Sequence, residues 1–139
     1  MRLNLEKQLT QNFKLKEFLI SDFYNFEQQK AVLKSVSYPI LQNIHDLADN
    51  LQVLRSYLNQ PISINIAYRP LWWELQQGRS GTSQHVKGKA ADIVIEGMET
   101  KKIYLKIESL IKQGKMLQGG LGIYPTFIHY DIRNYKARW

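Results

Sequence analysis

Residues 62–69 alternate between large apolar side chains and smaller or polar ones, the pattern of a β-strand. One face of this strand would carry Ile62, Ile64, Ile66 and Tyr68. The opposite face would carry Ser63, Asn65, Ala67 and Arg69. The sequence thus predicts a strand that contributes an apolar face to a core and keeps a mostly polar face on its other side.

Helical and strand patterns surround this segment. Apolar residues recur every three or four positions from residue 40, which predicts an amphipathic helix ending near Asn59 with Pro39 in its first turn. A similar stripe over 101–113 predicts a second helix that stops at Gly114. Further strands are predicted at 91–95, 119–124 and 127–133. Because no regular βαβ alternation occurs, we expect an α+β fold with an antiparallel sheet packed against helices.

Residues 70–89 show no regular periodicity and predict an irregular loop of about twenty residues. The segment is rich in Ser, Gln and Gly, including Gly78, Gly81 and Gly88. A structureless loop of that length in a compact domain is usually functional. Its Trp72 and Trp73 would either form a platform for a sugar or peptide or seal the loop onto the core.

The chain has 139 residues, of which 44% are hydrophobic, enough for one packed core. We therefore expect a single domain over residues 1–139, with 1–11 as a lead-in. The absence of cysteine excludes disulfides, cysteine-ligated zinc, iron–sulfur clusters and a thiol nucleophile. Any metal must be held by histidines and carboxylates.

The formal net charge of +7 favours polyanionic surroundings such as nucleic acid, anionic lipid or bacterial cell wall. No recognition-helix pattern or aromatic interleaving accompanies the lysines, so nucleic acid is not a predicted partner. No apolar run approaches the ~20 residues that a membrane-spanning helix needs. The first residues have no signal-peptide pattern, so we expect the protein to be made in the cytoplasm. We also expect it to be a monomer.

Two of the three histidines lie near carboxylates in segments where a structured site is easy to build. His85 falls in the Gly-rich loop and Asp92 begins the next strand, while His129 and Asp131 share a face of the last strand. A catalytic zinc ion takes three protein ligands and leaves one position open, and His85, Asp92 and His129 would supply such a set. An ordinary hydrogen-bonded role for the histidines is the alternative. His45 lies within the first amphipathic pattern and is predicted to be a helix-surface residue.

The segment Ser83–Asp92, SQHVKGKAAD, resembles the Ser-x-His-x-x-Gly-x-Ala-x-Asp signature of the zinc D-alanyl-D-alanine carboxypeptidase family. This family shares its fold with the hedgehog signalling domain. Tyr68-Arg69 resembles the family's Ser-Gly-Tyr-Arg segment. Residues 12–18 and 119–133 resemble the opening and closing motifs of a branch of small single-domain members. The similarity runs from about residue 12 to the last residue.

The resemblance implies roles for particular residues. The ligands of Zn²⁺ would be His85, Asp92 and His129. Arg69 would lie near the substrate and could bind a peptide carboxylate or the developing oxyanion, with an ordinary salt bridge as the alternative. Ser83 and Gln84 could hydrogen-bond the substrate backbone or orient His85.

The general base departs from the family pattern. Well-studied members carry Glu or Asp three residues before the last zinc histidine, and this chain has Thr126 there. Asp131 is the nearest replacement, because residues two apart on a strand project to the same side. Asp131 is either the catalytic base or a partner that orients the imidazole or pairs with Arg133. Glu74 and Glu96 are weaker candidates.

The family resemblance implies a zinc-dependent peptidase that hydrolyses peptidoglycan stem peptides or cross-links, as a D,D-carboxypeptidase or an endopeptidase. A phage or prophage lysis or tail-associated enzyme is a reasonable setting, and we expect action at the bacterial cell wall after release. The alternative is a non-catalytic module of the same fold that keeps zinc for structure or recognition. Thr126 is the feature that favours this alternative.

Overall fold

A computed structural model describes all residues 1–139. Its centre is a five-stranded sheet in the order β1-β2-β4-β3-β5. The strands are β1 (Ser63–Ile66), β2 (Ala90–Val94), β3 (Gly120–Ile123), β4 (Ile128–Asp131) and β5 (Ala137–Arg138). The predicted α+β class is confirmed. The sheet is mixed rather than wholly antiparallel, because the chain crosses β3 after β4 and adds β5 parallel to its free edge.

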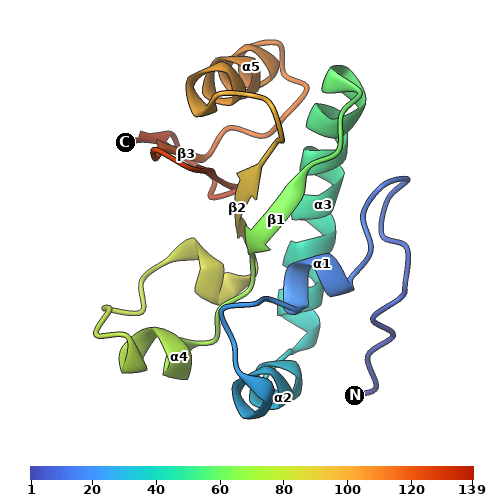
Figure 1. Ribbon diagram of the computed structural model, residues 1–139, viewed down its shortest axis with the longest axis vertical. Helices are drawn as coiled ribbons and strands as arrows, with labels where there is room; N and C mark the ends of the chain where they lie inside the picture. Colours follow the sequence, from blue (N-terminus) through green and yellow to red (C-terminus); the bar gives the residue numbers. More distant parts are fainter.

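Two long helices pack with this sheet (Figure 1). α3 (Tyr38–Leu58) has a proline in its first turn and ends at Asn59, which adopts the left-handed conformation at φ 52°. α5 (Thr100–Lys112) packs against β3 and β4. Both helices lie where the apolar stripes predict them, within two residues at each end. None of the helices combines the length and the apolar character needed to cross a membrane.

The N-terminal segment packs its aromatic residues into the core. Phe13 and Phe18 are buried, with ring centroids 5.9 Å apart. The second of these rings belongs to the short helix α1 (Lys16–Leu19). α2 (Phe26–Lys34), which the sequence patterns do not predict, begins at a capping box between Asn25 and Gln28. In Figure 1, α2 lies at the opposite end of the molecule from α5.

The strand predicted over 62–69 is shorter in the structure, where it ends at Ile66, and its ladder with β2 contains an irregularity. Ile64 pairs with Ile93 but Ile66 pairs with Asp92, so the register shifts by one residue between them. Beyond the strand, the consecutive residues Ala67 and Tyr68 are both buried. The predicted division of this segment into one apolar and one polar face is therefore wrong past the bulge.

The segment 70–89 is not a structureless loop. It contains α4 (Leu71–Gln76) and a 3₁₀ helix, η1 (Gln84–Lys87), which leaves residues 77–83 as its irregular part. Trp73 of α4 is buried and meets the ring of Tyr24 edge-on, with centroids 5.4 Å apart. This tryptophan seals the segment onto the core, the second of the two roles predicted for it.

The two faces of the central strands carry different kinds of side chain. On one face, apolar residues of neighbouring strands meet in the core: Ile93, Ala91, Ile128, Tyr130 and Leu121. On the other face, Asp92 of β2 lies opposite His129 of β4, which lies opposite Gly122 of β3. A single apolar core of 27 buried residues thus supports a sheet whose second face carries the polar residues of interest.

Candidate metal centre

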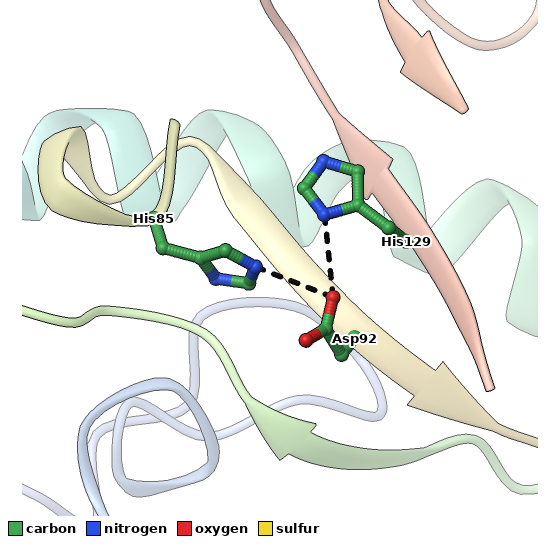
Figure 2. A group of neighbouring side chains, drawn as sticks. All are labelled: His85, Asp92 and His129. Carbon is green, nitrogen blue, oxygen red and sulfur yellow. Dashed lines mark ion pairs between the residues drawn. The ribbon is translucent and has the colours of Figure 1, made fainter. Parts of the chain in front are cut away.

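Three of the predicted site residues meet on the polar face of the sheet (Figure 2). His85 comes from η1, Asp92 from β2 and His129 from β4, and one ligand atom of each lies within 4.8 Å of the others. Asp92 Oδ1 is 3.2 Å from His85 Nε2 and 3.3 Å from His129 Nδ1. The structure therefore brings together residues that are 7 and 37 positions apart in the sequence.

Local structure explains this convergence. The Ser83 hydroxyl accepts a hydrogen bond from the His85 backbone N–H at 3.2 Å and caps η1. Gly88 then adopts φ 73°, a left-handed conformation that favours glycine, and ends η1. The chain reverses there and enters β2, so that His85 lies above Asp92. The antiparallel register of β2 and β4 places His129 beside the same carboxylate.

Hydrogen bonds determine which nitrogen of each histidine faces the cluster. His85 Nδ1 lies 2.6 Å from the Ala67 carbonyl oxygen. A carbonyl only accepts, so Nδ1 carries the proton and Nε2 offers a lone pair. His129 Nε2 lies 2.6 Å from Asp131 Oδ2, and a carboxylate acceptor likewise leaves Nδ1 with the lone pair. In the neutral rings, both lone pairs point toward Asp92.

The cluster is buried, and burial changes the protonation of its members. Burial lowers the pKa of His85 and favours the neutral ring that metals bind. Burial also lowers the pKa of His129, but Asp131 and Asp92 outweigh it and the net pKa is raised. Burial opposes ionisation of Asp92, but when the two imidazoles carry a second proton that faces Asp92, their hydrogen bonds and charge outweigh burial and hold the Asp92 pKa below its ordinary value.

These residues fit a divalent cation. Asp92 Oδ1 is buried without a hydrogen-bond partner and faces ring nitrogens whose protons are on the far side. A buried carboxylate oxygen opposite two lone pairs is electrostatically unfavourable unless a positive charge lies between them. Two imidazoles and one carboxylate form a donor set that zinc accepts, with a position left open.

Both carboxylate oxygens of Asp131 already accept hydrogen bonds, unlike those of a carboxylate that is free to act as a general base. Its Oδ1 accepts from the Gly120 N–H at 2.9 Å and from the Arg133 N–H and Nε at 3.1 and 2.8 Å. Its Oδ2 accepts from Arg133 Nη2 at 2.7 Å and from the His129 ring. Burial raises the pKa of Asp131, but hydrogen bonds from His129 and Arg133 outweigh it and lower the pKa. Both contacts of the orienting alternative are present, and no oxygen is left free.

The two weaker base candidates lie outside the open site. Glu74 is fully buried, and its carboxylate contacts Arg69 Nη2 at 3.3 Å and Arg79 Nη1 at 2.8 Å. Glu96 is exposed just beyond β2 and does not line the cleft. Thr126, at the position where the family carries its base, lines an adjoining hollow.

The cluster forms the floor of a cleft of about 490 Å³. Arg69, Ser83 and Gln84, the three predicted substrate-binding residues, all line it. Arg69 Nη2 lies 3.4 Å from the Ser83 hydroxyl. Burial lowers the pKa of Arg69, which nearby Glu74 partly offsets. Ser83 thus contacts both the backbone of His85 and the Arg69 side chain, while the Gln84 side chain lines the cleft without a hydrogen-bond partner in the protein.

Further cleft residues were not predicted. The aromatic side of the cleft consists of Tyr124, Phe127 and Trp139. The indole of Trp139 lies 4.9 Å from the His129 ring and donates to the Tyr124 hydroxyl at 2.7 Å. Trp139 packs where a Cβ on Gly122 would overlap its indole. Gly122 was the one sequence signal that a large side chain covers this strand.

His45 lies apart from this site. It is exposed on α3, 3.6 Å from Asp49 of the next turn. Its predicted place on the helix surface is confirmed.

A buried His-Asp-His cluster at the floor of an arginine-lined cleft is an arrangement that metallopeptidases use. The family model of peptidase M15 matches residues 12–131, so the chain belongs to the peptidase M15 family. The predicted likeness to zinc D-alanyl-D-alanine carboxypeptidases is thereby confirmed.

The chain is also similar to a curated protein, the probable peptidoglycan L,D-endopeptidase MepK of Haemophilus influenzae (strain ATCC 51907 / DSM 11121 / KW20 / Rd). The two are 33% identical over 98 residues, which cover 63% of this chain and 50% of that protein. The chain therefore spans about half the length of this relative.

Proposed function

We propose that this protein is a zinc-dependent peptidase that hydrolyses peptide bonds of peptidoglycan stem peptides or cross-links. Asp92 Oδ1 carries the proposal, because it is buried without a hydrogen bond between two imidazole lone pairs. His85, Asp92 and His129 would hold the ion. When bound, a zinc ion polarises the scissile carbonyl and lowers the pKa of water.

The remaining residues would position the substrate and the ligands. Arg69 would bind a substrate carboxylate or the developing oxyanion, and its planar fork suits either. Ser83 and Gln84 would hydrogen-bond the substrate backbone. Asp131 would orient the His129 ring, since all of its acceptor positions are already used.

The shape of the site favours an endopeptidase over a carboxypeptidase. A second hollow adjoins the cleft and shares Arg69, Arg79, Asp92 and Phe127 with it. This hollow extends toward Phe23 and Asn65, on the β1 side of the cluster, whereas the cleft extends toward the aromatic residues beside β3. A peptide could thus occupy both sides of Asp92, which cleavage within a chain requires. The name of the similar Haemophilus protein agrees with this choice.

A module that binds zinc without hydrolysing peptides is the second candidate. The residues that line the cleft include no carboxylate besides Asp92, and Thr126 stands at the usual base position. Catalysis would then need a base supplied from elsewhere, such as a carboxylate of the substrate. For either candidate, the place of action would be the bacterial cell wall, whose anionic polymers suit a chain of charge +7. A phage or prophage setting is part of the proposal.

Metal analysis combined with digestion of purified peptidoglycan separates these functions. We expect about one zinc ion per chain, and release of new amino groups without free D-alanine, abolished by a chelator. Release of free D-alanine would instead identify a carboxypeptidase. Bound zinc with no release of either product would favour the binding module.

Ligand substitutions locate the metal. His85→Ala, Asp92→Ala and His129→Ala should each abolish tight zinc binding, because a three-ligand site loses a third of its donors. His45→Ala is the matched control, since it removes an exposed histidine away from the cleft. Stoichiometric zinc in the double variant His85→Ala/His129→Ala would contradict the proposed site.

A further inference from the structure

The charged side chains around the metal cluster are dominated by arginines. The cleft is lined by Arg69, Arg79 and Arg133, with Asp92 as its sole carboxylate. Arg133 is already neutralised, because its Nε and Nη2 both donate to Asp131. Arg69 and Arg79 are thus the cationic side chains of the cleft whose positive charge is not fully neutralised and is available to an anionic ligand.

These two arginines share one buried counter-ion. Glu74 is fully buried on α4, with one oxygen 3.3 Å from Arg69 Nη2 and the other 2.8 Å from Arg79 Nη1. Because both guanidinium groups contact a single carboxylate, they lie close to each other. Two positive charges against one negative charge leave a net charge of +1 in the wall of the cleft.

Arg79 is held in place but keeps free donors. Its guanidinium carbon lies 5.4 Å from the centre of the Trp73 ring, and Trp73 is itself buried. The Arg79 side chain is nevertheless 49% exposed, and Nη1 makes its only side-chain hydrogen bond, the one to Glu74. Arg69 is similar, because its Nε is buried without a partner. Donors fixed in this way lose little entropy when a ligand binds.

We propose that Arg69 and Arg79 together bind a free carboxylate of the peptide substrate beside the metal cluster, with Arg79 as the residue that determines specificity. A ligand carboxylate would balance the charge, since two guanidinium groups would then face two carboxylates. The inference rests on the proposed function and names its substrate class, peptides with a free carboxylate near the scissile bond. That carboxylate is either the end of the peptide or a side-branch acid.

A purely structural role explains less of what the structure shows. One arginine would suffice to neutralise Glu74. An arginine with a purely structural role is essential only if its removal leaves a buried carboxylate without a partner. Arg79 is half exposed, lies on an irregular segment and lines both the cleft and the adjoining hollow. A counter-ion alone has no need to line either space.

The test uses three peptides that differ only in charge: a stem peptide with free carboxylates, the same peptide with its terminal carboxylate amidated, and the same peptide with its side-branch carboxylate amidated. Wild-type protein should prefer the free acid over one of the two amides by about 10-fold or more in kcat/KM. The amide that is discriminated against identifies which carboxylate is bound.

Substitutions then assign the preference to Arg79. Arg79→Gln should reduce the acid-to-amide ratio toward one, and Arg79→Lys, which keeps the charge but loses the fork, should reduce it partway. Arg2→Gln is the matched control, because it removes one exposed arginine far from the cleft in sequence and should leave the ratio unchanged. Thermal unfolding of each variant shows whether it is folded.

Equilibrium binding of the same peptides to zinc-free protein, measured by calorimetry, separates this inference from the proposed function. If no peptide is hydrolysed but the free acid still binds more tightly through Arg79, the carboxylate site stands and the peptidase proposal fails. If peptides are hydrolysed but wild-type protein treats the acid and both amides alike, the carboxylate site is wrong and the peptidase proposal stands. An unchanged ratio in folded Arg79→Gln also overturns the role of Arg79.

Discussion

The two imidazoles of the cluster are each fixed by the ring nitrogen that faces away from Asp92. His85 uses a backbone carbonyl, that of Ala67, and His129 uses the carboxylate of Asp131. Such partners set the tautomer and the direction of the lone pair, so they affect metal affinity as well as orientation. The two histidines therefore differ in their sensitivity to mutation, because only one of the partners is a side chain.

Asp131→Asn should weaken zinc binding by ~10–100-fold, with activity restored by excess zinc. The amide cannot match a carboxylate that accepts from His129 and from Nε and Nη2 of Arg133. Metal occupancy and rate are measured on the same samples, with exposed Asp49→Asn as the matched control. Full zinc occupancy with a rate loss that excess zinc does not repair would instead show Asp131 to be the general base.

Arg69→Lys should lower kcat/KM by about 10-fold or more while zinc content and folding stay unchanged. The lysine keeps a positive charge near Glu74 but cannot present the two-pronged donor that a carboxylate or oxyanion accepts. Steady-state kinetics and thermal unfolding check this expectation. A variant that unfolds, yet whose folded fraction retains normal activity, would show Arg69 to be structural.

At the scale of elements, β3 depends on having no side chains on its outer face. A Cβ on Gly120 would overlap the Asp131 carboxylate, and one on Gly122 would overlap the Trp139 indole. The strand can therefore lie directly beneath the groups that orient His129 and wall the cleft. This close approach, and not backbone conformation, explains both glycines, since neither has a positive φ.

Gly122→Ala should destabilise the protein by ~1–3 kcal/mol and move Trp139 away from His129. Urea unfolding gives the stability, and tryptophan fluorescence reports the displacement. Trp139→Ala removes the clashing group, so the double variant should be more stable than the sum of the two single effects predicts. Strict additivity would show that the glycine does not make room for the indole.

The edge strand β5 is tied to α5 by an ion pair with a predictable pH dependence. Arg138 Nε and Nη2 donate to the two oxygens of Glu108 at 3.0 and 2.8 Å, and these hydrogen bonds lower the Glu108 pKa below 4.5. Because the folded-state pKa is the lower one, the stabilisation is present above the unfolded-state pKa and is lost as pH falls through the folded-state value.

Glu108→Gln should therefore reduce the free energy of unfolding at pH 7 by under ~1 kcal/mol, as expected for a solvent-screened pair, and lower Tm slightly. The gap between the variant and wild type should shrink as pH falls below about 4.5. Thermal unfolding across pH 3–7 measures it, and Glu96→Gln, at an exposed residue with no ion pair and outside the helices, should show no such trend. A gap that is constant with pH would contradict the assignment.

At the scale of the whole molecule, the three residues of the metal cluster come from separate segments of the chain, which only the tertiary fold brings together. His85 and Asp92 flank a chain reversal, whereas His129 arrives after α5 and β3. An ion bound by all three would bind the folded chain in preference to the unfolded one, and so would stabilise it.

A chelator should lower Tm, and added zinc should restore it. The loss corresponds to about 3–4 kcal/mol when free zinc was 100–1,000 times Kd. The variant His85→Ala/His129→Ala should show no response to chelator, which separates loss of the ion from direct effects of the reagent. An unchanged wild-type Tm would mean that zinc does not bind this cluster tightly.

Local patterns in the sequence predicted much of the fold. The three- and four-residue stripes placed α3 and α5, and the three later strands lie where alternation or turn signals indicated. Residues 70–89 were wrongly predicted to lack structure, because a six-residue helix and a single 3₁₀ turn are too short to show periodicity. β5 was missed for the same reason, since two residues carry no pattern.

Residue types and spacing in the sequence determined which side chains to examine, because ligand chemistry belongs to the residues themselves. The tertiary structure decided what each of them contacts. Asp131 looked equally suited to two roles until the structure surrounded it with donors from Gly120, His129 and Arg133. Arg79 carried no signal until α4 placed Glu74 between it and Arg69. The contact between Gly120 and Asp131 spans 11 residues and the two contacts of Glu74 span 5 residues each, and no local pattern in the sequence records them.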